Sequence, residues 1–264
     1  MPTKKRGRKI LAKEIPLQVS PQPNKSSSAQ QLLKQMIKDA FLEYKEDQTT
    51  QSRDAYSFVG TLPDWAIKQH IKDGVIKIDP LPQGWEEKVD EVTIDFHLGN
   101  KLRVFTLEGL NTIDTRFTTK EEMESMMRIV ELKGGQPFIL TENDFIIATT
   151  KERLSLPNDI VGHLHGKSSL ARLGIVVHST AARFDPGWDG CPVLEFGTFL
   201  KGKKIVIYEG SPICAFSFER LAHPVDRSHS QNPRSYGGSV NPEVSHISLY
   251  ASTTKNGLKK KSNS

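Results

Sequence analysis

The side chains with the clearest chemical potential gather in one stretch of the chain, from Gly166 to Phe196. Serines, arginines, a lysine and carboxylates alternate there with apolar runs that predict core strands. Charged groups beside a core are costly unless something pairs with them. This stretch is therefore the first place to look for a functional site.

Glu195 interrupts an otherwise apolar strand that we predict over residues 192–197. A carboxylate in such surroundings suits a general base, which must be positioned to accept a proton. A second interpretation stays open. Alternation along the strand places Glu195 opposite Leu194, and so on the solvent face of an edge strand.

Lys167 and Arg172 flank a short helical turn that Ser168 or Ser169 is predicted to cap and that Gly174 is predicted to end. Cations beside a helix N-terminus, where backbone N–H groups are free, suit the phosphates of a nucleotide. The alternative is a set of surface charges on a turn.

A P-loop is excluded, because that motif needs four residues between its glycines and only three separate Gly162 from Gly166. Further along the chain, Arg183 adds a third cation. Asp185 opens an Asp-Pro-Gly turn and could accept a hydrogen bond from a sugar hydroxyl. Plain turn chemistry explains Asp185 equally well.

The elements that must position these residues are mostly short strands separated by Gly, Pro, Asn or Asp. Period-two alternation is clearest in residues 92–98. The other strands are predicted at 102–106, 138–140, 145–150, 159–164, 174–179, 192–197, 204–208, 213–218 and 246–250. Many short strands at such spacing favour an all-β barrel or sandwich.

Three helices are predicted around these strands. Apolar residues at helical spacing predict one over residues 29–47, packed either on its own domain or on a partner subunit. A second begins near Thr61, which is predicted to cap it, and ends at Gly74. A third covers about residues 119–130, with Thr119 as its cap.

The chain has 264 residues and a net charge of +5, which is enough length for one large domain or two small ones. Residues 1–13 and 255–264 carry ten Lys or Arg and no acid, so subtracting ten from +5 leaves −5 on the part between them. The basic character belongs to the tails, which could contact nucleic acid or be plain solvated segments. No apolar run is long enough for a membrane span, and Cys191 and Cys214 are predicted to be reduced, buried thiols.

The stretch 166–196 closely resembles the deoxycytidine triphosphate (dCTP) deaminase family of the trimeric dUTPase superfamily. The resemblance rests on residues 166–174, 178–181, 183–191 and 193–196, and it extends in order over about residues 61–221. It implies a mainly β fold, a distorted dUTPase-like β-barrel with a few short helices. It also implies a homotrimer with active sites at the subunit interfaces, located in the cytoplasm.

The resemblance implies hydrolytic deamination of dCTP to dUTP, with Mg²⁺ bound through the substrate triphosphate and no zinc. Glu195 takes the place of the general base, and Ser168 and Arg172 those of residues that polarise the cytosine. Asp185 would hold the deoxyribose and the backbone of Val193 and Leu194 would read the base. The remaining predicted nucleotide-binding residues are Lys167, Ser169, Leu170, Ala171, Thr180, Ala181, Arg183 and Tyr236. Feedback inhibition by dTTP is a further expectation.

The chain departs from the family pattern at its C-terminal end. The family's closing Tyr, Lys-Tyr and Gln residues have no counterpart in residues 226–242, where Tyr236 with Arg234 could substitute or residues 235–239 could form a flexible lid. Arg183 stands where family members that also release dUMP usually carry glycine, which favours deamination alone. A bifunctional deaminase–diphosphatase and a non-catalytic trimeric nucleotide-binding regulator remain the alternatives.

The predicted organisation has three parts. Residues 1–60 form a basic, largely disordered extension that contains the first helix. Residues 61–250 form the deaminase-like barrel, and residues 251–264 form a basic flexible tail.

Overall fold

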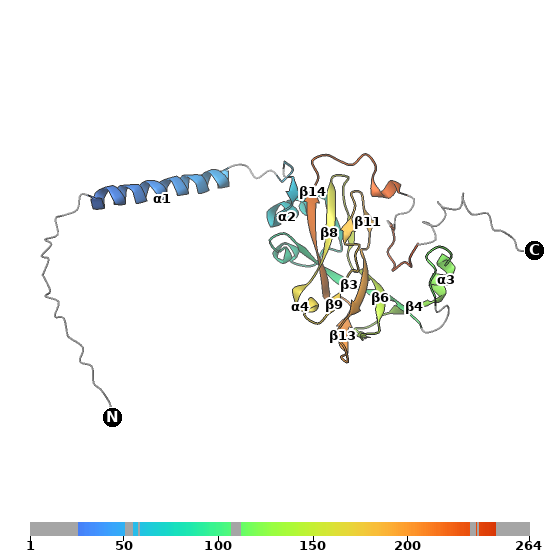
Figure 1. Ribbon diagram of the computed structural model, residues 1–264. Coiled ribbons are helices and arrows are strands. Elements are labelled where there is room, and N and C mark those ends of the chain that lie inside the picture. The colour runs from blue at the N-terminus through green and yellow to red at the C-terminus, as the bar shows by residue number, and fades with distance from the viewer. Residues whose placement is uncertain are drawn as a thin grey trace, which may run out of the picture. The chain divides into compact units, whose positions relative to one another are not determined.

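A computed structural model describes residues 26–50, 55–57, 59–106, 112–232, 236 and 238–246, with the side chains of the first helix described for residues 30–42 (Figure 1). The chain divides into two compact units, Met1–Arg53 and Asp54–Ser264. The division into parts at residues 60 and 251 stays a prediction.

The first unit contains the helix α1, Ser26–Thr50, which confirms the helix predicted over 29–47. Its large apolar side chains are exposed within this unit: Leu32, Leu33, Met36, Ile37, Phe41 and Leu42.

The second unit is built on one sheet of nine strands. Seven of them follow the order β10-β8-β14-β3-β6-β12-β9, while β1 pairs with β14 and β4 pairs with β3. Their bounds are β1 Gly60–Thr61, β3 Ile94–Phe105, β4 Met127–Glu131, β6 Phe145–Thr150, β8 Ile160–Gly166, β9 Ile175–Val176, β10 Arg183–Phe184, β12 Val193–Thr198 and β14 Pro212–Arg220. The described pairings in this sheet are antiparallel.

Two smaller sheets and several short helices accompany it. One has the order β11-β7-β2, and the other pairs β13 with β5. Their bounds are β2 Lys77–Asp79, β5 Pro137–Leu140, β7 Arg153–Ser155, β11 Asp189–Gly190 and β13 Ile205–Tyr208. The helices are α2 Asp64–Lys72, α3 Lys120–Ser125 and α4 Ser168–Ala171, with 3-10 turns η1 Trp85–Lys88 and η2 His229–Gln231.

The nine-stranded sheet must curl because of one short connection. β9 and β10 lie at opposite ends of the seven-strand path, yet only residues 177–182 separate them in the chain. Seven fully extended residue steps reach about 25 Å, whereas seven flat strands are about 29 Å wide. The two edges are therefore drawn toward each other, and the sheet curls into a half-barrel (Figure 1). This agrees with the prediction of a mainly β fold with a distorted, dUTPase-like β-barrel.

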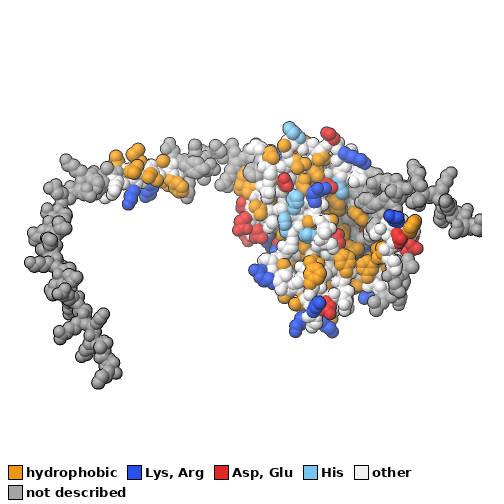
Figure 2. Space-filling model, in the orientation of Figure 1, with side chains coloured by type: hydrophobic (Ala, Val, Ile, Leu, Met, Phe, Trp, Pro, Cys, Tyr) orange, Lys and Arg blue, Asp and Glu red, His pale blue; other side chains and the backbone are white. Residues whose placement is uncertain are grey.

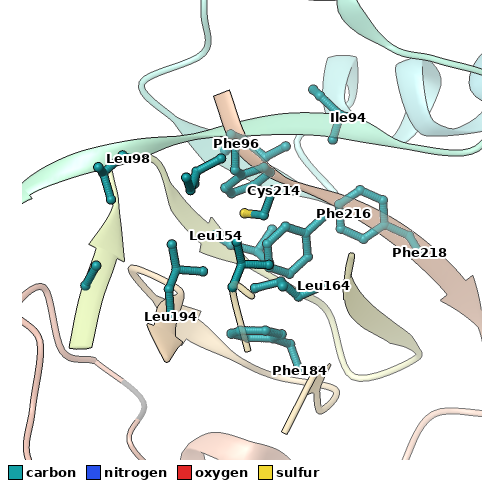
Figure 3. Packing of buried hydrophobic residues seen from close by; sticks show 14 of the residues in the cluster. Ile94, Phe96, Leu98, Leu154, Leu164, Phe184, Leu194, Cys214, Phe216 and Phe218 are labelled. Atoms are coloured by element: carbon teal, nitrogen blue, oxygen red, sulfur yellow. The ribbon is translucent and has the colours of Figure 1, made fainter. Parts of the chain in front are cut away.

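Aromatic side chains fill the curled sheet. Phe216 of β14 lies 4.6 Å from Phe96 and 5.0 Å from Phe184, measured between ring centroids (Figure 3). Cys214 and Leu164 join the same cluster. Six consecutive residues of β14 are buried, so this central strand is covered on both faces.

Part of the predicted helix over 119–130 is wrong. α3 ends at Ser125, and residues 127–131 form β4, which pairs with β3 from Lys101 to Phe105. Ile129 and Val130 are β-branched and suit a strand. The predicted capping box is confirmed, because Thr119 and Glu122 exchange side-chain and backbone hydrogen bonds.

The predicted cap of the second helix is also wrong. Thr61 lies in β1 opposite Glu219, and α2 begins after Pro63. The strands predicted at 92–98 and 102–106 form one continuous strand, β3, because β6 and β14 pair along different parts of it. His246 lies outside a strand, and the rest of the predicted strand 246–250 lies outside the described residues.

Replacement of a central core residue should be far costlier than replacement of an exposed one. Phe216→Ala leaves a cavity among Phe96, Phe184 and Phe218 and should lower the free energy of unfolding by about 3–5 kcal/mol. Phe117 is exposed, so Phe117→Ala should change it by less than about 0.5 kcal/mol. Urea unfolding of both variants measures the difference, and equal effects would contradict the described core.

The stability of the barrel should fall in mild acid through His70 of α2. His70 is buried, and burial lowers its pKa below the ordinary value despite its contact with the carbonyl of Ala66. Below a pH of about 6.5 the unfolded chain gains a proton that the folded chain excludes, so the free energy of unfolding decreases as pH falls toward the lowered pKa. His70→Leu should show a smaller decrease than the parent between pH values of about 7.5 and 5.

The control is His223→Leu, because His223 is exposed and its replacement should preserve the parent's pH dependence. Thermal unfolding of the three proteins at each pH provides the comparison. Identical pH dependence in His70→Leu and the parent would show that His70 does not contribute to acid sensitivity.

Candidate active site

We call the opening between the two edges of the curled sheet, which the connection of residues 177–182 spans, its mouth. Glu195 lies in β12, the strand next to the edge strand β9. Its neighbours Leu194 and Phe196 are fully buried, while Glu195 itself is half-buried and faces away from them. The backbone N–H of Ser179, in the connection between β9 and β10, donates to Glu195 Oε2 at 3.2 Å. One carboxylate oxygen is thus held by the segment that crosses the mouth.

Thr180 and Ala181 lie on this same connecting segment, and both are exposed. The N–H of Leu164 in β8 donates to the carbonyl oxygen of Ala182 at 2.8 Å, which ties the segment to the opposite edge of the sheet. Val193 and Leu194 pair with Thr149 and Ala148 of β6.

α4 follows directly from the end of β8. Ser168, Ser169, Ala171 and Arg172 are exposed on it, whereas Leu170 packs partly against the core. The Arg172 guanidinium donates to the carbonyl oxygen of Ser168 at 2.9 Å.

The predicted serine cap of this turn is wrong. Lys167 is the N-cap residue, and α4 has no side-chain cap. The predicted end at Gly174 is three residues late, because α4 ends at Ala171 with Arg172 as its C-cap. Gly174 ends the turn that follows: its φ is +66°, and a Cβ there would come within 3.1 Å of the Leu200 nitrogen. Glycine is needed at such a close, left-handed turn.

α4 is fastened to the strand that carries Glu195. β9 pairs with Gly197 and Thr198 of β12, and the Thr198 hydroxyl donates to the carbonyl oxygen of Leu173 at 3.0 Å. The N–H of Phe199 donates to the carbonyl oxygen of Gly174 at 2.9 Å. The turn that carries α4 is therefore attached to the C-terminal end of β12, the strand that contains Glu195.

Lys167 has a carboxylate partner that sequence reasoning missed. Its ammonium group lies 2.5 and 2.6 Å from the two oxygens of Asp95 in β3, and each side chain is only 24% exposed. The signal was the alternation in β3, which places Asp95 on the face opposite Ile94 and Phe96. A cation held this way is oriented as well as neutralised.

Arg183 and Asp185 also form a pair. Arg183 Nε donates to Asp185 Oδ1 at 2.7 Å, and Arg183 lies in β10 opposite His163 of β8. Asp185 also borders a cleft of about 220 Å³ between its own turn and the segment after β14.

Two histidines of β8 were missed as well. His163 lies 3.1 Å from Glu219, and His165 lies 2.7 Å from the hydroxyl of Ser217. Burial lowers the pKa of His165, and the neighbouring His163 and His178 lower it further. Histidine side chains gather on the face of the barrel seen in Figure 2.

The C-terminal segment, part of which was predicted as a flexible lid over residues 235–239, is docked on the barrel. Gly238 and Ser239 form backbone hydrogen bonds with Asp189 and Cys191, so the segment lies along the edge of β11. The Tyr236 hydroxyl accepts from the N–H of His246 at 2.8 Å, and its ring packs against the core. The lid prediction is therefore wrong for Gly238 and Ser239, and its residues 235 and 237, with Arg234, lie outside the described residues.

Both cysteines are free thiols, Cys214 buried and Cys191 half-buried. Burial raises the pKa of both thiols, which keeps them protonated at neutral pH. Within the described residues, no group of three His, Cys, Asp or Glu side chains is arranged to hold a metal ion. No described helix is long and apolar enough to cross a membrane.

The fold and the site combine a curled β-sheet, a half-buried carboxylate at its mouth, and the cations Lys167 and Arg172 on either side of a short helical turn. A protein-family model described as dCTP deaminase-like matches residues 61–221, which is more than half of the chain. The chain belongs to the dCTP deaminase-like family.

Curated relatives support this assignment. The dCTP deaminase of Thermomicrobium roseum is 38% identical over 187 residues, covering 70% of this chain and 93% of the relative. That of Idiomarina loihiensis is 42% identical over 176 residues, covering 64% and 88%. A protein of Dictyoglomus thermophilum named "dCTP deaminase, dUMP-forming" is 33% identical over 189 residues, covering 71% and 95%.

The solved structures are more distant. The 2'-deoxycytidine 5'-triphosphate deaminase of Agrobacterium tumefaciens has a TM-score of 0.48 at 23% identity, covering 62% of this chain and 49% of that one. The EIAV dUTPase has a TM-score of 0.29 at 18% identity, covering 38% and 79%. The family assignment rests on the sequence matches.

The Lys167–Asp95 pair should contribute more to stability than an exposed pair. Asp95→Asn leaves the ammonium group of Lys167 half-buried without its counter-charge and should cost about 1–3 kcal/mol of unfolding free energy. Glu131→Gln removes an exposed pair with Lys133, whose ammonium group lies 3.1 Å from the carboxylate, and should cost no more than about 0.5 kcal/mol. Chemical denaturation of both variants tests this, and equal costs would show that the Lys167–Asp95 pair adds little.

Proposed function

We propose that this protein hydrolyses dCTP to dUTP and ammonia, with Glu195 as the general base. Membership of the dCTP deaminase-like family supports the reaction. The position of Glu195 carries the proposal, because it is the half-buried carboxylate at the mouth, held through one oxygen by the N–H of Ser179.

The proposed reaction needs one water molecule and no redox step. Glu195 takes a proton from water while the water oxygen forms a bond to C4 of the cytosine ring. That proton then passes to the exocyclic amine, the C4–N bond breaks, and ammonia leaves. The second proton of the water moves from the new C4 hydroxyl to N3 of the ring, which leaves the C4 carbonyl of the uracil. Because Ser179 occupies Oε2, the other oxygen of Glu195 is left to act as the base.

Ser168 and Arg172 would polarise the cytosine during this attack. Lys167, Ser169 and Arg183 supply donors for the phosphates, and magnesium would arrive as the complex of the substrate triphosphate. Lys167 and Arg183 already have carboxylate partners, so phosphate binding would share or replace those pairs. In this scheme the water is activated by a carboxylate, without zinc.

The other proposed contacts with the nucleotide come from the family resemblance. Asp185 would hold the sugar, while the backbone of Val193 and Leu194 would read the base. Leu170, Ala171, Thr180 and Ala181 would line the nucleotide from α4 and the connecting segment. Tyr236 packs against the core of its own chain, which weakens its proposed contact with the nucleotide.

A homotrimer with active sites between subunits is part of this proposal. Leu173 is 41% exposed and Phe199 is 76% exposed, and both adjoin the exposed face of α4. An active site must exclude bulk water, and a neighbouring subunit packed on these side chains would cover Ser168 and Arg172. A cytoplasmic location and inhibition by dTTP stay predictions of the family resemblance.

A second candidate is the bifunctional reaction that releases dUMP and diphosphate. Relatives at 33–34% identity are named dUMP-forming, which favours it. Arg183, where such members usually carry glycine, favours deamination alone. A non-catalytic nucleotide-binding regulator is a third outcome that the same assay separates.

Incubation of the purified protein with dCTP and magnesium should yield dUTP and ammonia, separated by chromatography. Glu195→Gln keeps the shape of the side chain and removes the base, so its turnover should fall by about 10²–10⁴-fold. Glu209→Gln, an exposed residue outside the site, should retain parental activity. Release of dUMP by the parent would establish the bifunctional reaction, and bound dCTP without turnover would establish the regulator.

A further inference from the structure

The turn that carries Asp185 is locked against the segment that follows β14. The N–H of His229 donates to the carbonyl oxygen of Pro186 at 2.9 Å. At Gly187, whose φ is +78°, a Cβ would come within 1.9 Å of the hydroxyl oxygen of Ser228. The two segments touch so closely that they form one fixed unit.

This unit encloses a small polar cleft of about 220 Å³. Asp185 supplies a carboxylate from one wall, and the other wall supplies donors and a histidine. The lining residues are Asp185, Pro186, Val225, Arg227, Ser228, His229 and Asn232. A polar cleft with a carboxylate acceptor suits a hydroxyl-bearing ligand such as a sugar ring.

His229 lies beside the second oxygen of Asp185. Arg183 donates to Oδ1, while His229 Nδ1 lies 3.8 Å from Oδ2. The His229 side chain is only 13% exposed, and its ring lies 5.0 Å from the ring of Trp188. Asp185 is therefore flanked by a basic group on each side, one exposed and the other packed in place.

The other ring nitrogen of His229 fixes which tautomer is favoured. Nε2 is buried and has no hydrogen-bond partner in the described part of the chain. A buried N–H without an acceptor is costly, so the neutral ring should carry its proton on Nδ1. That turns an N–H toward Asp185 Oδ2 and attracts the carboxylate electrostatically across the 3.8 Å between the two atoms.

We propose that His229 is a positioning residue for Asp185, the carboxylate to which the proposed function assigns the sugar hydroxyl of the nucleotide. This inference rests on the proposed function for the identity of the nucleotide. Asp185 accepts the sugar hydroxyl, and His229 holds the carboxylate in the orientation that accepts it. The wall formed by residues 225–232 keeps His229 in place.

The test compares two substrates that differ by one hydroxyl, dCTP and 2',3'-dideoxy-CTP, in the full-length protein. His229→Leu should raise KM for dCTP about tenfold and leave kcat within about twofold, because a binding contact is lost. The same variant should leave KM for the dideoxy substrate unchanged, since that substrate lacks the hydroxyl. His229→Asn keeps an N–H near the position of Nδ1 and should restore most of the affinity for dCTP.

His223→Leu is the matched control, because His223 is exposed on the same segment and lines no part of the cleft. Thermal unfolding checks that each variant is folded. An equal rise in KM for both substrates would show a general structural role for His229 and overturn the proposal. Unchanged KM values in His229→Leu would overturn it as well.

A binding measurement separates an error in the proposed reaction from an error in the role of His229. If the parent does not deaminate dCTP, the proposed reaction is wrong, and equilibrium binding of the same two nucleotides replaces the kinetic measurement. A tenfold preference for dCTP that His229→Leu abolishes and His229→Asn retains would still support the sugar site. Equal binding of both nucleotides by the parent would overturn it.

Discussion

The six-residue connection between β9 and β10 is the constraint on which the site depends. It joins the two edges of a sheet path that is wider when flat than the connection can span. The sheet curls in response, and the connection crosses its mouth. Glu195 accepts a hydrogen bond from the backbone N–H of Ser179, which lies in this connection. The same residues that shape the barrel therefore also orient the candidate base.

Two cations of the candidate site are paired with carboxylates. Lys167 is paired with Asp95 and Arg183 with Asp185, so both cations predicted to meet phosphates have carboxylate partners. Such pairs lower the penalty of holding charge beside an apolar core and fix the directions of the side chains. The exposed face of α4 has the opposite character, since Leu173 and Phe199 leave apolar surface next to Ser168 and Arg172.

Much of the fold could be predicted because strand alternation and turn residues are local signals. The strands around residues 145–150, 192–197 and 213–218 follow apolar patterns in their own sequence. The errors came where pairing overrode local preference. Residues 127–131 complete a sheet edge on β3, and Thr61 joins β14, although each sits next to a genuine helix signal.

The sequence by itself determined the family and the mainly β class, because these depend on residue types at fixed spacing along the chain, and it proposed Glu195 as the base. Only the tertiary structure decided that Asp95 holds Lys167, that His229 flanks Asp185 and that the C-terminal segment docks on β11. Each of these contacts joins residues tens of positions apart. Their partners are selected by the tertiary arrangement of the strands and loops, which no local pattern encodes.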